Sequence, residues 1–176
     1  WHPMSFNPQT GLVYLPAQNV PVNLTEDKNW KNDVAAPGSL GSGLGWNLAQ
    51  LVNATPPKSQ PFGRLIAWDP VKQQAAWKQD YVSPWNGGTL TTAGNLVFQG
   101  LADSRFVAYN AATGDKLWEQ PTGTGIVAGP ATYMVDGEQY VSVAVGWGGV
   151  YGLAARATDK EGPGTVFTYK LGGKAC

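Results

Sequence analysis

The sequence predicts an all-β fold, and three observations favour it. Apolar runs of strand-like composition are short and closely spaced, no segment keeps an apolar period of 3.6 residues, and turn-forming residues are abundant. The 176 residues include 23 Gly and 13 Pro, together with 8 Trp, 7 Tyr and 5 Phe. Because so many aromatic side chains can bury a large area, this composition indicates a folded, turn-rich β domain rather than a disordered chain.

Nine segments have the length and composition of β-strands, and turn formers separate them. The predicted strands are Gly11–Leu15, Arg64–Trp68, Ala75–Lys78, Thr89–Thr92, Leu96–Gln99, Arg105–Tyr109, Lys116–Glu119, Tyr140–Val145 and Val166–Tyr169. The predicted tight turns are Thr10–Gly11, Ala93–Gly94–Asn95, Thr113–Gly114–Asp115 and Asp136–Gly137. Short strands that follow one another so closely predict antiparallel meanders.

One stretch of the sequence occurs twice, as IAWDPVKQQAAWKQ at residues 66–79 and as VAYNAATGDKLWEQ at residues 107–120. A repeat of about 40 residues built from short strands is typical of propeller blades, each of which is a four-stranded antiparallel sheet. Each copy is therefore predicted to be half a blade, with a third strand, a tight turn and an outer strand. The shared positions are Ala67, Asp69 and Trp77 in the first copy and Ala108, Asn110 and Trp118 in the second.

The turn of the second copy has residues suited to a tight connection. The Asn110 side chain can bond nearby backbone amides, and Gly114 can adopt a positive φ without steric cost. Because Gln73 stands where the second copy has Gly114, we expect the first turn to be built differently. Trp118 is expected to lie flat between adjacent blades and to bury roughly 150 to 250 Å² there.

A weaker echo of the same turn occurs near the start of the chain. In MSFNPQTGLVY, Asn7, Thr10 and Gly11 match the turn, but Leu15 occupies the position of the tryptophan, so this segment is not a full repeat. A stretch rich in Pro, Gly and Asn, residues 19–60, follows it. This stretch is too long for an ordinary blade turn and predicts an insertion over one face.

Charge and cysteine content argue against several classes of protein. Twelve basic and twelve acidic residues cancel, so the basic surface of a nucleic-acid binder is not expected. No apolar run is long enough to predict a transmembrane segment. The only cysteine, Cys176, excludes a CxxCH haem attachment or a CxxC zinc site within these residues. The sequence predicts no metal site and no acid/base pair of carboxylates, and His2 is interpreted as a hydrogen-bonded structural residue.

The repeat resembles a known motif. The pattern formed by Ala108, Asn110, Thr113, Gly114 and Trp118 is similar to the tryptophan-docking motif of the pyrroloquinoline quinone (PQQ) dehydrogenases. Three further stretches, WHPMSFNPQTGLVYLPAQ, PWNGGTLTTAGNLVFQG and YVSVAVGWGGVYG, resemble the C-terminal third of the propeller in the quinohaemoprotein alcohol dehydrogenases. The resemblance covers nearly the whole chain.

The resemblance implies that residues 1–176 are about three blades of an eight-bladed propeller. The segment 19–60 would interrupt the sixth blade, Gly87–Pro121 would form the seventh, and Ile126–Leu171 would form most of the eighth. Residues 170–176 would begin an interdomain linker. In this family the propeller holds PQQ and a calcium ion on its axis and oxidises alcohols to aldehydes in the periplasm, and in the haem-bearing branch a cytochrome c domain takes the electrons.

The resemblance also implies which residues face the cofactor. Trp85 and Asn86 match a Trp–Asn pair whose amide contacts the quinone edge, and Val145, Gly146 and Trp147 match a segment that approaches PQQ from the last blade. An amide can donate to a quinone oxygen, on which charge develops when the cofactor accepts hydride.

Each of these two segments continues into a glycine pair. Gly87–Gly88 and Gly148–Gly149 would let the backbone come close to a planar ligand. Other interpretations of the same residues stay open: Asn86 could cap the turn before Gly87–Gly88, and Trp147 could pack into the core.

Several elements of the family's site are expected to lie outside this chain. The aspartate base, the calcium ligands, the vicinal disulfide and the basic residue beside the quinone belong to earlier blades, so no catalytic residue is predicted here. We therefore expect a fragment that works with the rest of the propeller, an alcohol substrate and either a cytochrome c domain or another electron acceptor. A haem-free quinoprotein similar to methanol dehydrogenase and a non-catalytic scaffold propeller are the alternatives.

Overall fold

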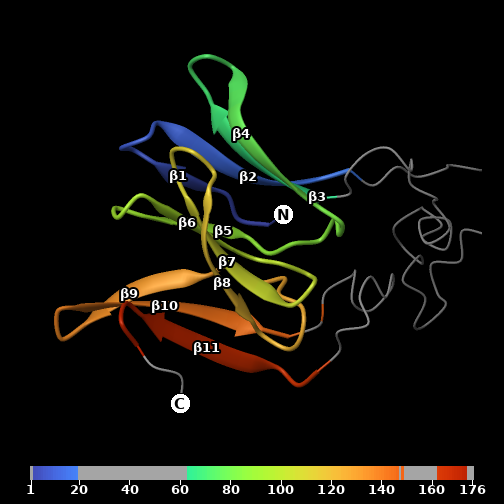
Figure 1. The fold of residues 1–176 in the computed structure, drawn as a ribbon, viewed down its shortest axis with the longest axis vertical. Coiled ribbons are helices and arrows are strands. Elements are labelled where there is room, and N and C mark those ends of the chain that lie inside the picture. Colours follow the sequence, from blue (N-terminus) through green and yellow to red (C-terminus); the bar gives the residue numbers. More distant parts are fainter. Residues whose placement is uncertain (1, 20–62, 147, 149–161, 174–176) are drawn as a thin grey trace, which may run out of the picture. The chain divides into compact units, whose positions relative to one another are not determined.

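The computed structural model describes residues 2–19, 63–146, 148 and 162–173 (Figure 1). Trp147, Gly149 and residues 174–176 lie outside these described residues, and so does the predicted insertion apart from its first residue. The domain boundaries drawn from the sequence at 19–60 and 170–176 therefore stay predictions.

The described residues form strands and turns, without a helix. The strands are β1 (Ser5–Asn7), β2 (Leu12–Gln18), β3 (Gly63–Asp69), β4 (Gln74–Tyr81), β5 (Thr89–Thr92), β6 (Leu96–Gly100), β7 (Arg105–Asn110), β8 (Lys116–Pro121), β9 (Ala131–Val135), β10 (Glu138–Val145) and β11 (Thr165–Lys170). All nine predicted strands are present, and two further strands, β1 and β9, were not predicted.

The strands form three antiparallel sheets, with the orders β1-β2-β3-β4, β5-β6-β7-β8 and β11-β10-β9. In the second sheet β7 is the third strand and β8 the outer strand, as the repeat predicts. The strands on either side of residues 19–62 pair directly, with Leu15 opposite Ile66. The all-β prediction and the blade-like sheets are thus confirmed.

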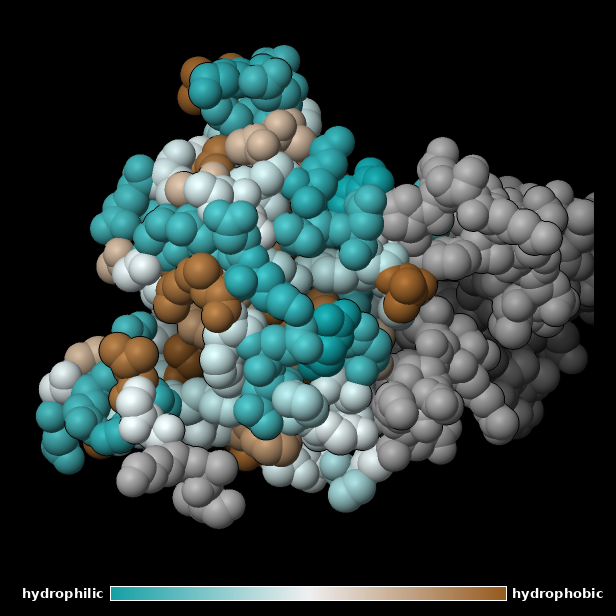
Figure 2. All heavy atoms as spheres, in the orientation of Figure 1, coloured by the Kyte–Doolittle hydropathy of each residue, from teal (hydrophilic) through white to brown (hydrophobic). Residues whose placement is uncertain are grey.

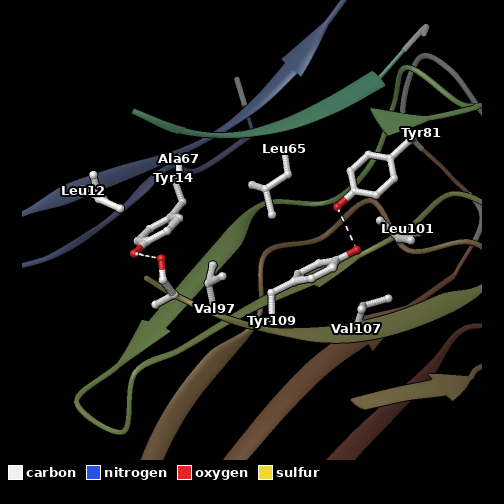
Figure 3. Packing of buried hydrophobic residues seen from close by; sticks show 10 residues of the cluster. Leu12, Tyr14, Leu65, Ala67, Tyr81, Val97, Leu101, Val107 and Tyr109 are labelled. Carbon is white, nitrogen blue, oxygen red and sulfur yellow. Dashed lines mark hydrogen bonds between the residues drawn. The ribbon is translucent and has the colours of Figure 1, made fainter. Parts of the chain in front are cut away.

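The second sheet shares a core with each of the other two. One core joins it to the first sheet through Leu12, Tyr14, Leu65, Ala67, Tyr81, Val97, Leu101, Val107, Tyr109 and Ala111 (Figure 3). The other joins it to the third sheet through Phe106, Ile126, Val141, Val143 and Val145. Because successive side chains of a strand point to opposite faces, β7 directs Phe106 into one core and Val107 into the other.

The turns of the two repeat copies have the same construction. The Asn110 Oδ1 atom accepts hydrogen bonds from the backbone amides of residues 112 and 113, and the Asp69 Oδ1 atom accepts them from residues 71 and 72. Gly114 has a φ of 81° and Gln73 a φ of 54°. The expectation of a different first turn was wrong, because a non-glycine residue takes up the left-handed conformation that the Asx turn requires.

The N-terminal echo of the repeat also forms this turn. The Asn7 Oδ1 atom accepts a hydrogen bond from the Gln9 amide, and Gly11 has a φ of 70°. This turn joins β1 to β2, whereas the other two join a third strand to an outer strand. The same local sequence thus closes hairpins at different places in a sheet, which is why no tryptophan follows Gly11.

Candidate functional site

The two tryptophans of the repeat occupy equivalent places in successive sheets. Trp77 lies opposite Ala67, and Trp118 lies opposite Ala108. In both sheets the pairing register shifts directly after this alanine, on the third strand. The repeat therefore specifies a common register as well as a common turn.

Trp77 packs against the turn of the neighbouring sheet. Its indole Nε1 donates to the Ala111 carbonyl oxygen over 3.0 Å, and its ring covers Gly114 so closely that a Cβ there would lie 2.7 Å from Trp77 Cδ2. The Gln79 amide donates to the Gly114 carbonyl oxygen over 2.8 Å. Gly114 thus serves both the positive φ of the turn and the close approach of the indole.

Trp118 does not reach the same degree of burial. Its side chain packs edge-on against Phe106 and Tyr169, with ring centroids 6.0 Å and 5.2 Å away, and the residue is 37% exposed. Most of the Trp118 surface is therefore buried, as expected, but its ring contacts are edge-on, and no turn among the described residues covers it as the Ala111–Gly114 turn covers Trp77. Within the turn that Trp77 covers, the Thr113 hydroxyl donates to the Asp115 carboxylate over 2.6 Å.

Several apolar side chains are exposed among the described residues. Those on strands are Phe6 on β1, Leu117 and Trp118 on β8, Tyr133, Met134 and Val135 on β9, and Val166 on β11, and those outside the strands are Met4, Val71, Val82 and Leu171. The face drawn in Figure 2 is hydrophilic over much of its area, with separate brown patches of apolar residues.

The segment between β4 and β5 carries the predicted Trp–Asn pair. Asn86 is 4% exposed, and both ends of its side-chain amide are bonded within the chain. The Nδ2 atom donates to the Ser83 carbonyl oxygen over 2.7 Å, and the Oδ1 atom accepts from the Ala102 amide over 3.1 Å. This geometry fits a structural cap, the alternative that the sequence left open for Asn86.

The glycines that follow Asn86 contact the chain itself. A Cβ on Gly87 would lie 2.5 Å from the Ala128 carbonyl oxygen, and one on Gly88 would overlap the ring of Pro3. The space left by these missing side chains is therefore filled by protein, which corrects the expectation that both glycines face a planar ligand. Gly148 differs, because no atom of the other described residues lies within 4 Å of the position of its Cβ.

The second predicted cofactor segment is only partly described. The Val145 side chain is buried in the core shared with Phe106 and Ile126, and the Gly146 amide donates to the Gly125 carbonyl oxygen over 3.1 Å. Trp147 lies outside the described residues. Contact of this segment with a cofactor stays a prediction, and the side chain of Val145 is turned to the core.

A buried network of side-chain hydrogen bonds reaches Gly87, the residue after Asn86. The Tyr81 hydroxyl lies 3.0 Å from Gln99 Oε1 and 3.1 Å from the Tyr109 hydroxyl (Figure 3), and Gln99 Nε2 donates to the Gly87 carbonyl oxygen over 2.9 Å. Because Oε1 can only accept, Tyr81 donates to it and the Tyr109 hydroxyl donates to Tyr81. Burial raises the pKa of both tyrosines, which keeps the two hydroxyl groups of this network uncharged.

His2 lies beside Trp85, a neighbour that the sequence did not reveal. The two rings meet edge to face with centroids 5.9 Å apart, and the Gln18 Nε2 atom lies 3.2 Å from His2 Nδ1. The other ring nitrogen, Nε2, is buried and has no hydrogen-bond partner in the described part of the chain. Burial is the main reason that the pKa of His2 is lowered from 6.5.

Comparison with known proteins gives this arrangement a family. Residues 1–141 match the family described as PQQ glucose/ethanol/alcohol dehydrogenase, β-propeller domain. The chain belongs to this family. It is 75% identical over 175 residues to the quinohemoprotein alcohol dehydrogenase of Comamonas testosteroni and 63% identical to the 1-butanol dehydrogenase (cytochrome c) of Thauera butanivorans. In each case 99% of this chain and 25% of the relative are covered.

Solved structures agree with the propeller assignment. The crystal structure of the Comamonas testosteroni quinohemoprotein alcohol dehydrogenase matches all of this chain with a TM-score of 0.84 and 74% identity, over 26% of its own length. A europium-containing methanol dehydrogenase matches 87% of this chain with a TM-score of 0.63 and 29% identity, also over 26% of its length. This PQQ propeller chain thus spans about a quarter of the relatives that it matches.

The described residues fit one wall of a cofactor site. They provide the half-buried Trp85 ring, the Asn86 amide and, in contact with Trp85, His2, whose Nε2 atom has no partner among the described residues. No group of three or more His, Cys, Asp or Glu side chains suited to a metal ion occurs among them. Among the same residues, no helix has the length and apolar character of a membrane span.

Proposed function

We propose that this chain is part of a PQQ-dependent alcohol dehydrogenase that oxidises alcohols to aldehydes in the periplasm and passes the electrons to haem c. The observation that carries the proposal is the 75% identity, over 99% of the chain, to a quinohemoprotein alcohol dehydrogenase. The 63% identity to a 1-butanol dehydrogenase (cytochrome c) supports the same reaction class and electron acceptor.

The chain's own contribution is to bind and orient the cofactor. When bound, PQQ supplies the two-electron acceptor for the alcohol, and calcium is held by residues elsewhere in the whole protein. Trp85 would provide a flat apolar surface, and the second N–H of the Asn86 amide is proposed as a donor to the cofactor, with the side chain oriented by its buried bonds to Ser83 and Ala102. Trp147, Gly146 and Val145 are proposed to approach the cofactor from the next blade, with Val145 acting through its backbone.

The repeat residues are proposed to have a structural role in this propeller. The contact of Trp77 with the turn that ends at Gly114 is the geometry expected of a tryptophan-docking motif, because a residue of one blade covers the turn of the next. Trp118 would make the same contact with a turn that follows β11. The exposed ring of Trp118 supports this proposal.

A haem-free quinoprotein is the second candidate. The likeness to a europium-containing methanol dehydrogenase favours it, although the identity of 29% is well below the 75% found for the quinohemoprotein relative. The two candidates differ in whether the whole protein carries a c-type haem.

The test uses the full-length protein that carries this chain, reconstituted with PQQ and calcium. We expect reduction of an artificial dye that depends on both the alcohol and PQQ, and a c-type haem spectrum that changes when alcohol is added. Activity without a haem spectrum would support the haem-free candidate. No alcohol-dependent reduction in a folded, PQQ-loaded protein would contradict both candidates and leave the scaffold alternative.

A further inference from the structure

Two buried polar atoms without partners lie close to Trp85. Four such side-chain atoms occur among the described residues: His2 Nε2, Asn7 Nδ2, Ser83 Oγ and the Tyr169 hydroxyl. His2 is 9% exposed and Ser83 is 8% exposed. Because buried polar groups are nearly always hydrogen-bonded in native proteins, each unpaired atom indicates a missing partner.

His2 and Ser83 belong to one neighbourhood. Gln18, which contacts His2, lies opposite Gly63 across β2 and β3. Gly63 in turn packs against the backbone of Ser83 and the amide of Asn86. The contact between the His2 and Trp85 rings completes the cluster. The residues that carry the two unpaired atoms are thus linked through Gln18, Gly63 and Trp85 to the segment that we propose for the cofactor.

The contacts of His2 define which kind of partner its free nitrogen needs. The Gln18 Nε2 atom is an amide nitrogen that can only donate, so His2 Nδ1 must accept and the ring proton of the neutral imidazole is on Nε2. Nε2–H is thus a buried donor without an acceptor. The partner that it requires is an oxygen acceptor, and the Ser83 hydroxyl can complement such a group as donor or acceptor.

We propose that the Nε2–H group of His2 donates a hydrogen bond to an oxygen of the quinone cofactor bound beside Trp85, which makes His2 a cofactor-binding residue. The proposal rests on the proposed function, since it assumes that the bound group is PQQ. The edge-to-face contact holds the imidazole against Trp85, so a ligand that contacts this tryptophan comes within reach of His2. A quinone that bears carboxylates offers both carbonyl and carboxylate oxygens as acceptors.

The first test measures affinity rather than turnover. The full-length protein is prepared without PQQ, and tryptophan fluorescence is recorded while PQQ is added in the presence of calcium. His2→Phe keeps a flat ring but removes the donor, and we expect the Kd for PQQ to rise about tenfold, the change that one hydrogen bond gives. His2→Gln places an amide N–H near the position of Nε2–H and is expected to restore the affinity to within about threefold of the wild-type value.

The second test needs no substitution. The ¹⁵N resonances of His2 in the wild-type protein should show the Nε2–H tautomer before PQQ is added, and the Nε2 resonance should shift on binding while Nδ1 changes little. This measurement keeps the proposal testable if His2→Phe does not fold.

The outcomes separate the inference from the proposed function. If the wild-type protein does not bind PQQ at all, the proposed function fails. If the wild-type protein binds PQQ but His2→Phe binds it equally tightly, or the Nε2 resonance does not shift, the partner of His2 is a water molecule or another part of the protein and the inference is overturned. Equal losses in His2→Phe and His2→Gln would also overturn it, because the donor would then not matter.

Discussion

Replacing Gly114 by alanine tests the contact between the first two sheets. Gly114 has a φ of 81°, and a Cβ there would lie 2.7 Å from Trp77 Cδ2. The left-handed conformation costs an L-residue about 1–2 kcal/mol, and overpacking that displaces Trp77 costs about 1–3 kcal/mol more. We therefore expect Gly114→Ala to lower the free energy of unfolding by about 2–5 kcal/mol, measured by urea denaturation with circular dichroism and tryptophan fluorescence.

Gly123→Ala is the matched control. Gly123 has a φ of 80°, and no atom of the described residues beyond its chain neighbours lies within 4 Å of the position of its Cβ, so the substitution carries the backbone cost without the contact. We expect this variant to lose only about 1–2 kcal/mol. Equal losses in the two variants would refute the reasoning, because the indole would then contribute nothing to the need for glycine at position 114.

Three further predictions concern other parts of the chain. Gln73→Gly should raise the free energy of unfolding by about 0.5–1 kcal/mol, because removing the strain of a left-handed non-glycine residue outweighs the extra conformational entropy that glycine loses on folding. A lower free energy of unfolding in urea denaturation would contradict this prediction. Tyr81→Phe removes the link between Tyr109 and Gln99 and should cost about 1–3 kcal/mol in the same assay, whereas Tyr133→Phe on an exposed strand should change stability by less than about 0.5 kcal/mol. For His2 the folded-state pKa is lowered, so the unfolded chain binds the proton first as the pH falls. The free energy of unfolding of the wild-type protein should therefore fall below about pH 6.5, and it should fall less in His2→Gln. Identical pH profiles of the two proteins would show that His2 does not cause the acid destabilisation.

The sequence was most informative where structure depends on local chemistry. Asn110 and Gly114 were predicted to form a tight turn, and they do so because one side chain bonds two amides and the other residue allows a positive φ. The 41-residue spacing predicted equivalent places for Trp77 and Trp118, and both lie opposite an alanine beside a register shift. Such features depend on a few neighbouring residues, which a sequence displays directly.

Features that depend on distant contacts were predicted less well. Gln73 adopts the conformation of a glycine because the Asp69 turn and the strands on either side fix the backbone, and composition alone gave no sign of it. Strand β9 was missed because all five of its residues are exposed, so burial imposes no alternation on its sequence. The partial exposure of Trp118 depends on what lies over it, which its own copy of the repeat cannot specify.

In the candidate site, too, the residue types could be predicted from the sequence, whereas their hydrogen-bond partners could not. The Trp–Asn pair stood out in the sequence, but the hydrogen bonds of Asn86 to Ser83 and Ala102, which give the side chain a capping role, could not be predicted from it. His2 was interpreted as a hydrogen-bonded structural residue, and its Nδ1 atom does bond Gln18, but only the fold reveals that Nε2 is buried with no acceptor among the described residues. The buried donor next to Trp85 therefore supports a bound ligand independently of the family resemblance. This support follows only from the rule that buried polar groups are hydrogen-bonded, and it applies to any oxygen-bearing group that binds there.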